Sequence, residues 1–252
     1  MCARVLLVHG AADTGWSFHR LAAELESCGH VVAAPDLPCE DEEAGLEAYA
    51  DAALVPLAAM SRTDKPLVVL GHSLGGFTAP IVAERARADH LVFLTAMVPR
   101  PGETAGEWWG ATGHGEALKA SEFDETDDVA AFLHDVESGL AAEALRRGRG
   151  QTGRVMGDPF PLAALPAIPT TFLLCRDDRF FPAAWMRGVA EDRLGTEPIE
   201  VPGSHCAPLS RPAELAAALD ALVASDGGCR AKVGCRPGGW GRSGDGAELR
   251  RL

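Results

Sequence analysis

The sequence predicts an α/β domain in which a mainly parallel six-stranded sheet carries helices on both faces and a cap is inserted between two strands. Short aliphatic runs alternate with amphipathic stretches, a pattern typical of the right-handed crossovers that build a parallel sheet. The chain has 252 residues and is 47% hydrophobic, which is enough to bury one sizeable core. About 70 residues with little strand character separate the fourth run from the fifth, and so long an interval indicates an inserted cap.

Six short runs predict the strands. Most of them are continuously aliphatic, as expected for strands that are buried on both faces. In chain order the runs are 5–8, 30–34, 67–70, 91–95, 170–174 and 198–201.

Apolar residues at helical spacing predict the helices that alternate with these strands. Ser17 can cap the first helix, and Gly29 suits its left-handed end. One further helix, marked by apolar residues from Val129 to Leu140, is predicted inside the cap. The helices expected in the core are 18–28, 42–60, 75–88 and 212–224.

The same patterns divide the chain into a core, a cap and a tail. We expect residues 1–98 and 169–226 to form the core and residues 99–168 to form the cap, or lid. Residues 227–252 contain eight glycines and six Lys or Arg residues with little apolar periodicity. That composition is typical of a disordered segment.

Charge and cysteine usage exclude several classes of function. With 23 Lys and Arg against 36 Asp and Glu, the net charge is −13, which disfavours nucleic acids and anionic lipids as partners. No run of ~18 apolar residues is present, so no membrane span is expected, and no signal peptide is apparent. Seven scattered cysteines without a CxxC motif favour free thiols, a cytoplasmic protein and no zinc site. These features leave the oligomeric state open.

The strongest catalytic signal is the pentapeptide from Gly71 to Gly75, which fits G-x-S-x-G. It follows an aliphatic strand and opens a helix, the context of a nucleophile elbow. The turn forces Ser73 into a strained conformation and projects its hydroxyl above the sheet. We therefore expect Ser73 to be a nucleophile, while its neighbour His72 points away and has a packing role.

A serine nucleophile requires a base and an acid that orients the base. Of eight histidines, His205 lies just past the last strand, at the carboxyl edge of the sheet where ligands bind. The fifth strand runs into two adjacent aspartates, Asp177 and Asp178, of which only one can face the histidine. The chain order Ser, Asp, His is the order of the hydrolases that use such an elbow.

The oxyanion of an acyl transfer requires preorganised donors. One expected donor is the backbone N–H of Leu74, directly after the nucleophile, and the other is the N–H of Ala11 in the loop after the first strand. In the same loop, Asp13 and Thr14 either contact substrate or shape the loop, and these two interpretations are equally supported.

These segments together resemble the α/β-hydrolase superfamily, in particular its small members that include plant methylesterases, hydroxynitrile lyases and their bacterial relatives. The resemblance extends from about residue 4 to residue 224 outside the cap, and implies the compact six-stranded form of the fold. In the family's D-x-x-x-P pattern the catalytic aspartate stands four residues before the proline, which selects Asp178 before Pro182. The matching segments are VLLVHGAADTGWSF, GHVVAAPDLP, LVVLGHSLGG, LVFLTAMVPRPGET, RDDRFFP and GSHCAPLSRPAELA.

The resemblance also bears on the type of reaction. Lyases of this family carry Thr after the first-strand histidine and Lys after the catalytic histidine, whereas this chain has Gly10 and Cys206. The sequence therefore favours a cofactor-independent serine hydrolase of small carboxylic esters, with thioesters and lactones also possible and no metal required. The alternatives are a lyase or C–C bond hydrolase that uses the same triad, and a ligand receptor of the same fold with weak catalysis.

Aromatic residues of the cap are candidates for the substrate pocket. Trp108, Trp109, Phe123 and Phe132 can line an apolar pocket or pack within the cap. Together with Asp13, Trp108 and Trp109 are the expected substrate contacts.

Overall fold

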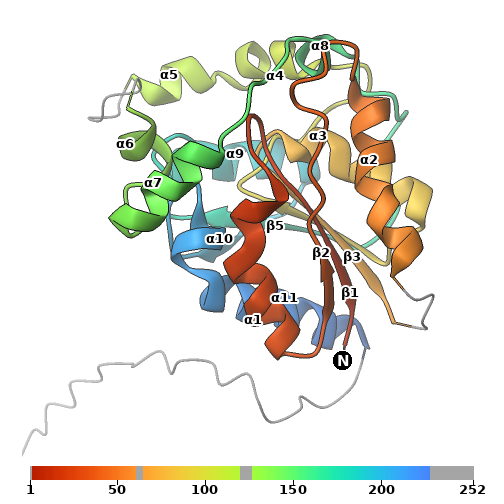
Figure 1. Cartoon of the computed structure of the whole chain (residues 1–252). Coiled ribbons are helices and arrows are strands. Elements are labelled where there is room, and N and C mark those ends of the chain that lie inside the picture. Colours follow the sequence, from red (N-terminus) through yellow and green to blue (C-terminus); the bar gives the residue numbers. More distant parts are fainter. Residues whose placement is uncertain (1, 61–64, 120–126, 228–252) are drawn as a thin grey trace, which may run out of the picture.

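The computed structural model describes residues 2–60, 65–119 and 127–227 and shows a single six-stranded sheet (Figure 1). All five strand pairings are parallel, and the strand order is β2-β1-β3-β4-β5-β6. The predicted fold class is confirmed. The strands are β1 (Arg4–Val8), β2 (Val31–Ala33), β3 (Leu67–His72), β4 (His90–Leu94), β5 (Thr170–Cys175) and β6 (Ile199–Val201).

Burial along the strands follows their place in the sheet. Every residue of the central strands β3 and β4 is buried, whereas the edge strands β2 and β6 are largely exposed or half-buried. The chain passes from β1 outward to β2 and then returns to the other side of β1 to form β3. A reversal of this kind leaves a crevice at the carboxyl ends of β1 and β3, where open α/β sheets bind their ligands.

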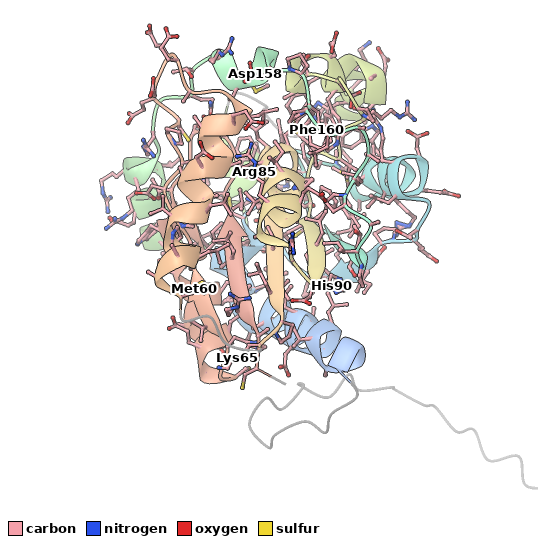
Figure 2. The ribbon with its side chains drawn as sticks, turned by 90° about the vertical axis from the view of Figure 1, so that its right-hand side faces the viewer. Met60, Lys65, Arg85, His90, Asp158 and Phe160 are labelled. Carbon is pink, nitrogen blue, oxygen red and sulfur yellow. The ribbon has the colours of Figure 1, made fainter. Side chains whose placement is uncertain are left out.

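Helices cover both faces of the sheet. On one face α1 (His19–Ser27) and α11 (Pro212–Gly227) pack together, and on the other face α2 (Leu46–Ala59) lies beside α3 (Gly75–Ala86). Figure 2 shows Arg85 between α2 and α3, where it pairs with Glu47 and Asp51. The remaining core elements are the 3-10 turn η1 (Gly15–Phe18), α9 (Ala183–Leu194) and α10 (Ala207–Ser210).

Alternating strand residues supply the two halves of the core. In β1, Val5 and Leu7 pack under α1 and α11, while Leu6 and Val8 face α2 and α3. This division follows from the two-residue period of a strand. It explains why the strand runs are continuously apolar rather than alternating.

Between β4 and β5 the described chain forms five short helices, and they lie together over the carboxyl end of the sheet (Figure 1). We call residues 99–168 the cap segment. Its helices are α4 (Ala105–Thr112), α5 (His114–Leu118), α6 (Asp128–Phe132), α7 (Ser138–Arg147) and α8 (Arg154–Gly157). Phe123 and the glycine-rich stretch 228–252 lie outside the described residues.

The single cap helix predicted from residue 129 to residue 140 is two helices. The side chain of Asp127 caps α6, and the side chain of Glu137 caps α7 through the amides of Gly139 and Leu140. The first amides of a helix need acceptors of this kind, so the cap at Glu137 marks the start of a second helix. The apolar residues of the pattern therefore belong to two helices and the turn between them.

The prediction that the cysteines are free thiols holds for only some of the described residues. Cys2, Cys39, Cys175 and Cys206 are free thiols, but Cys28 is disulfide-bonded, so the expectation of free thiols is wrong at that residue.

None of the helices within the described residues is long and apolar enough to span a bilayer. The cytoplasmic location stays a prediction.

Candidate active site

The turn from β3 into α3 has the strained geometry that the G-x-S-x-G motif predicts. Ser73 has a φ of +53°, in the left-handed region that residues with a Cβ rarely adopt. A Cβ on Gly71 would lie 2.6 Å from the carbonyl oxygen of Gly75, and one on Gly75 would lie 2.5 Å from the carbonyl oxygen of Val8. Only glycine fits at either place, so both glycines of the motif are required by close backbone approach.

Hydrogen bonds from the next strand hold this strained serine. The amide of Ser73 donates to the carbonyl of Leu94 at 3.4 Å, and its own carbonyl accepts from Gly76 at 3.0 Å and from Met97 at 3.0 Å. The side chain is half-buried and borders a cavity. Ser73 is thus fixed at the crevice between β1 and β3.

His205 and Asp178 meet as an acid–base pair. Nδ1 of His205 lies 2.8 Å from Oδ2 of Asp178, and both side chains are buried. Because a carboxylate only accepts, Nδ1 carries the proton and Nε2 is the ring nitrogen available as a base. The carboxylate is held in turn by the hydroxyl of Thr95 at 3.2 Å and by the amide of Phe181 at 2.9 Å.

The neighbouring Asp177 has a different position. Its side chain is exposed, accepts from the amide of Gly203 at 2.9 Å and lies 3.6 Å from Arg176. These contacts brace the loop that carries His205, but they do not reach the imidazole. The structure therefore places Asp178 against His205, in agreement with the D-x-x-x-P pattern.

His72 is hydrogen-bonded to the backbone of His205. Its Nε2 donates to the backbone carbonyl of His205 at 2.9 Å, and the two rings lie 4.8 Å apart. Complete burial lowers the pKa of His72 to about 3, so this imidazole is neutral and serves as a fixed donor. The packing role expected for His72 thus includes a hydrogen bond to the loop that carries His205.

Two backbone amides are free to bind an oxyanion. Within the described part of the chain, the amides of Ala11 and Leu74 donate to no acceptor. Gly10 lies against the nucleophile, since a Cβ there would be 2.8 Å from Cβ of Ser73 and 3.3 Å from its Oγ. His9 fixes the loop: it bonds the Gly10 carbonyl through Nδ1 at 2.8 Å and accepts the amide of Leu37 through Nε2 at 2.9 Å.

The loop after β1, the elbow and the His205 loop enclose a cavity of about 390 Å³. Its walls are mainly apolar, and cap residues Trp109 and Phe132 contribute to them. Trp108 does not line the cavity: it is fully buried, and its indole N–H donates to the carbonyl of Val98 at 3.2 Å. The cavity brings together Gly10, Ala11, Asp13, Ser73, Leu74, His205 and Cys206.

Several residues that line the cavity were not predicted from the sequence. Phe180 stands two residues after Asp178, and the paired aromatics of its RDDRFFP segment were an available signal. Arg149 and Met156 come from the cap segment, where no local pattern marks residues that reach the pocket.

The cap segment is hydrogen-bonded to three loops at the site: the His205 loop, the loop that carries Asp178 and the loop after β1. On the His205 loop, the carboxylate of Asp135 accepts the amide of Ser204 at 3.1 Å, and the carbonyl of Phe132 accepts the Ser204 hydroxyl at 3.0 Å and the amide of Cys206 at 3.2 Å. On the acid loop, Nε2 of His134 donates to the carbonyl of Asp177 at 2.9 Å.

The loop after β1 is tied to the cap in the same way. Arg149 donates its amide to the carbonyl of Ala12 at 2.8 Å, and the side chain of Gln151 accepts the amide of Ala12 at 3.1 Å. Ala12 has a positive φ of 55°, so these two bonds hold a strained residue beside the expected oxyanion donor. The cap segment thus forms part of the support of the site.

Within residues 2–60, 65–119 and 127–227, no group of three or more His, Cys, Asp or Glu side chains could hold a metal ion. The chemistry that the site can support is that of a serine beside an imidazole, a carboxylate and two free amides.

Comparison with known proteins identifies the family of the chain. A family model described as "Alpha/beta hydrolase family" matches residues 5–218, and the chain belongs to that family. Among curated proteins it is similar to Methylesterase 7 of Arabidopsis thaliana, with 24% identity over 245 residues, 86% of this chain and 94% of that protein. It is also similar to Salicylic acid-binding protein 2 of Nicotiana tabacum, with 26% identity over 255 residues, 85% of this chain and 94% of that protein.

Solved structures share the fold. A polyneuridine aldehyde esterase superposes with a TM-score of 0.73 at 20% identity and covers 88% of this chain and 99% of its own. A pyrethroid hydrolase superposes with a TM-score of 0.72 at 23% identity and covers 90% of this chain and 99% of its own. The expectation of an esterase-type α/β hydrolase related to plant methylesterases is confirmed at this level.

Proposed function

We propose that the chain is a cofactor-independent serine hydrolase that cleaves a small carboxylic ester through Ser73, His205 and Asp178. One observation carries the proposal: His205, which lies 2.8 Å from Asp178, lines the same cavity as a serine held in the left-handed conformation. Relatives named as esterases support the choice of an ester as substrate.

The proposed reaction begins with general-base catalysis. His205 takes the proton of the Ser73 hydroxyl through Nε2 as the oxygen attacks the ester carbonyl. Asp178 keeps the imidazole oriented and stabilises the imidazolium that forms. The amides of Ala11 and Leu74 bind the oxyanion of the tetrahedral intermediate, and such preorganised donors are together worth several kcal/mol of barrier.

Collapse of the intermediate completes the first half-reaction. His205 returns the proton to the departing alcohol, which leaves an acyl group on Ser73. Water then attacks the acyl-enzyme with His205 again as base, and the acid is released. Gly10 leaves room beside Ser73 for the adduct and for the attacking water, because a side chain there would overlap the nucleophile.

The cavity supports a small substrate. Its volume of about 390 Å³ is at the lower end of the range typical of small-molecule sites. The apolar wall from Trp109, Phe132 and Phe180 suits a hydrocarbon or aromatic part of the ester. Thioesters and lactones offer the same electrophilic carbonyl and fit the same mechanism.

A panel of p-nitrophenyl esters, graded from acetate to long acyl chains, tests the proposal. We expect the highest kcat/KM for short acyl groups, because the cavity is small, and loss of turnover with Ser73→Ala. If no ester in the panel is hydrolysed faster by the wild type than by Ser73→Ala, the proposed function is wrong.

A further inference from the structure

Asp13 brings a carboxyl group into the cavity that holds Ser73 and His205, and the mechanism above does not use it. The residue lies on the loop after β1, two positions beyond the expected oxyanion donor Ala11. It lines the cavity, and its carboxyl group is close enough to His205 for their charges to interact. Its Oδ1 accepts the amide of Thr14 at 2.7 Å. Within the described residues, no Lys, Arg or His side chain lies within ion-pair distance of this carboxyl group.

The groups around Asp13 leave its charge without a cation. His9 is neutral in this setting, because burial lowers its pKa and both its ring nitrogens are engaged by the Gly10 carbonyl and the Leu37 amide. Arg149 also lines the cavity, but its guanidinium bonds Glu40 and the carbonyl of Leu37. Besides His9, the imidazole whose charge would act on Asp13 is that of the proposed base, His205.

Other groups that face Asp13 are neutral or weak donors. The thiol of Cys39 lies 4.0 Å from the Asp13 carbonyl. The hydroxyl of Ser17 lies within hydrogen-bond distance of the Thr14 carbonyl and of the Asp13 carboxyl group, and it is a neutral donor. The thiol of Cys206 is neutral, since burial raises its pKa well above the ordinary value. Burial also raises the pKa of Asp13, because the charged carboxylate is desolvated.

A desolvated carboxylate on a mainly apolar wall gains most from a ligand that supplies a hydrogen-bond donor. A charge-assisted hydrogen bond is stronger than a neutral one, and an ammonium group adds charge complementarity. A carboxylate on the ligand would instead meet like charge. The cavity thus discriminates among esters of the same shape by the group that they place on Asp13.

We propose that Asp13 is a specificity-determining residue that selects esters carrying a donor group, an alkylammonium above all and a hydroxyl second, and that it rejects esters carrying a carboxylate. The proposal rests on the proposed ester hydrolysis and names the substrate class of that site.

Two rigid ester series test this selection. In the acyl series the substrates are methyl 4-(aminomethyl)benzoate, methyl 4-(hydroxymethyl)benzoate and methyl 4-ethylbenzoate; in the alcohol series they are the corresponding para-substituted benzyl acetates. Within at least one series, we expect kcat/KM for the aminomethyl ester to exceed that for the ethyl ester by about tenfold or more. For compounds that are bound but not turned over, their Ki values against p-nitrophenyl acetate hydrolysis replace kcat/KM.

Variants assign the preference to the residue. Asp13→Asn keeps the shape and an acceptor oxygen but removes the charge, so it should abolish most of the preference for the aminomethyl ester. Asp128→Asn is the matched control, because Asp128 also borders the cavity but is exposed on α6. The control should keep the preference of the wild type.

Three outcomes overturn the proposal: no preference in either series, the same preference in Asp13→Asn as in the wild type, or an equal loss on all esters. The last result would assign Asp13 to electrostatic support of His205. Hydrolysis of p-nitrophenyl acetate by the same preparations separates failure of this selection from failure of the hydrolase function.

Discussion

At the scale of single residues, the choice between two adjacent aspartates is decided by orientation. Asp178 is buried against His205, whereas Asp177 is exposed and accepts the amide of Gly203. We therefore expect Asp178→Asn to lower kcat by about 10³-fold or more, because the amide no longer stabilises the imidazolium. Asp177→Asn should lower kcat by less than about tenfold. Steady-state hydrolysis of p-nitrophenyl acetate measures both, and a larger loss in Asp177→Asn would move the acid by one residue.

Two other residues distinguish ester hydrolysis from cyanohydrin cleavage. Gly10 and Cys206 both border the cavity, so the comparison with family lyases applies to residues of the proposed site. Burial keeps Cys206 a neutral thiol, which supplies no fixed positive charge for departing cyanide.

We expect no cleavage of mandelonitrile above the buffer rate by an enzyme that hydrolyses activated esters. Cyanide release, followed colorimetrically with wild type and Ser73→Ala, provides the measurement. Serine-dependent release of cyanide faster than ester hydrolysis would show that the chain is a lyase.

At the scale of elements, the cap segment supports the loop that carries His205, the proposed base. Asp135, between α6 and α7, accepts the amide of Ser204 next to this histidine. Asp135→Ala should lower kcat by about tenfold with little change in KM, because the histidine loop loses a fixed contact while the substrate wall stays in place.

Asp135→Asn still offers an acceptor oxygen and should restore most of the activity. Glu143→Ala, which removes an exposed ion pair with Arg146 on α7, is the control for a charge change in the cap. Unchanged kcat in Asp135→Ala, or equal loss in both Asp135 variants, would contradict the positioning role.

Some secondary-structure elements could be predicted from the sequence and others could not. Strands and elbow were predictable because each rests on a local pattern: an aliphatic run, or a turn that tolerates only glycine at its corners. Helix α9 was missed because Met186, Val189 and Ala190 are its only buried residues in the described chain, so its apolar signal spans little more than one turn.

Contacts across the fold could not be predicted in this way. The break between α6 and α7 depends on Glu137 turning back to cap the second helix, and the place of Trp108 depends on its bond to Val98. A Trp-Trp pair gives no local signal of which ring lines a pocket: Trp109 does and Trp108 does not.

At the scale of the whole molecule, buried histidines make stability depend on pH. Burial lowers the pKa of His72 to about 3 and also lowers the pKa values of His9 and His30. Below pH 6.5 the unfolded chain takes up protons that the folded chain does not, so stability is lost as the pH falls toward the folded-state pKa values.

Each such histidine should reduce the free energy of unfolding by up to about 1.4 kcal/mol per pH unit in that window. Urea unfolding between pH 7 and pH 4.5 measures the slope. His72→Gln removes one titrating group, and its slope should be smaller than that of the wild type by about one proton. An equal slope in the two proteins would show that His72 does not titrate as described.

We expect the crevice at the reversal of strand order to hold one activated serine, and the proposed function depends on this claim. Reaction with a fluorophosphonate probe, followed by mass spectrometry of the labelled peptide, provides the test. We predict a single label on Ser73, with a rate that falls by about 10³-fold or more in His205→Ala, because the probe reports the activated nucleophile. Labelling at another residue, or labelling of Ser73 in His205→Ala within about tenfold of the wild-type rate, would contradict the claim.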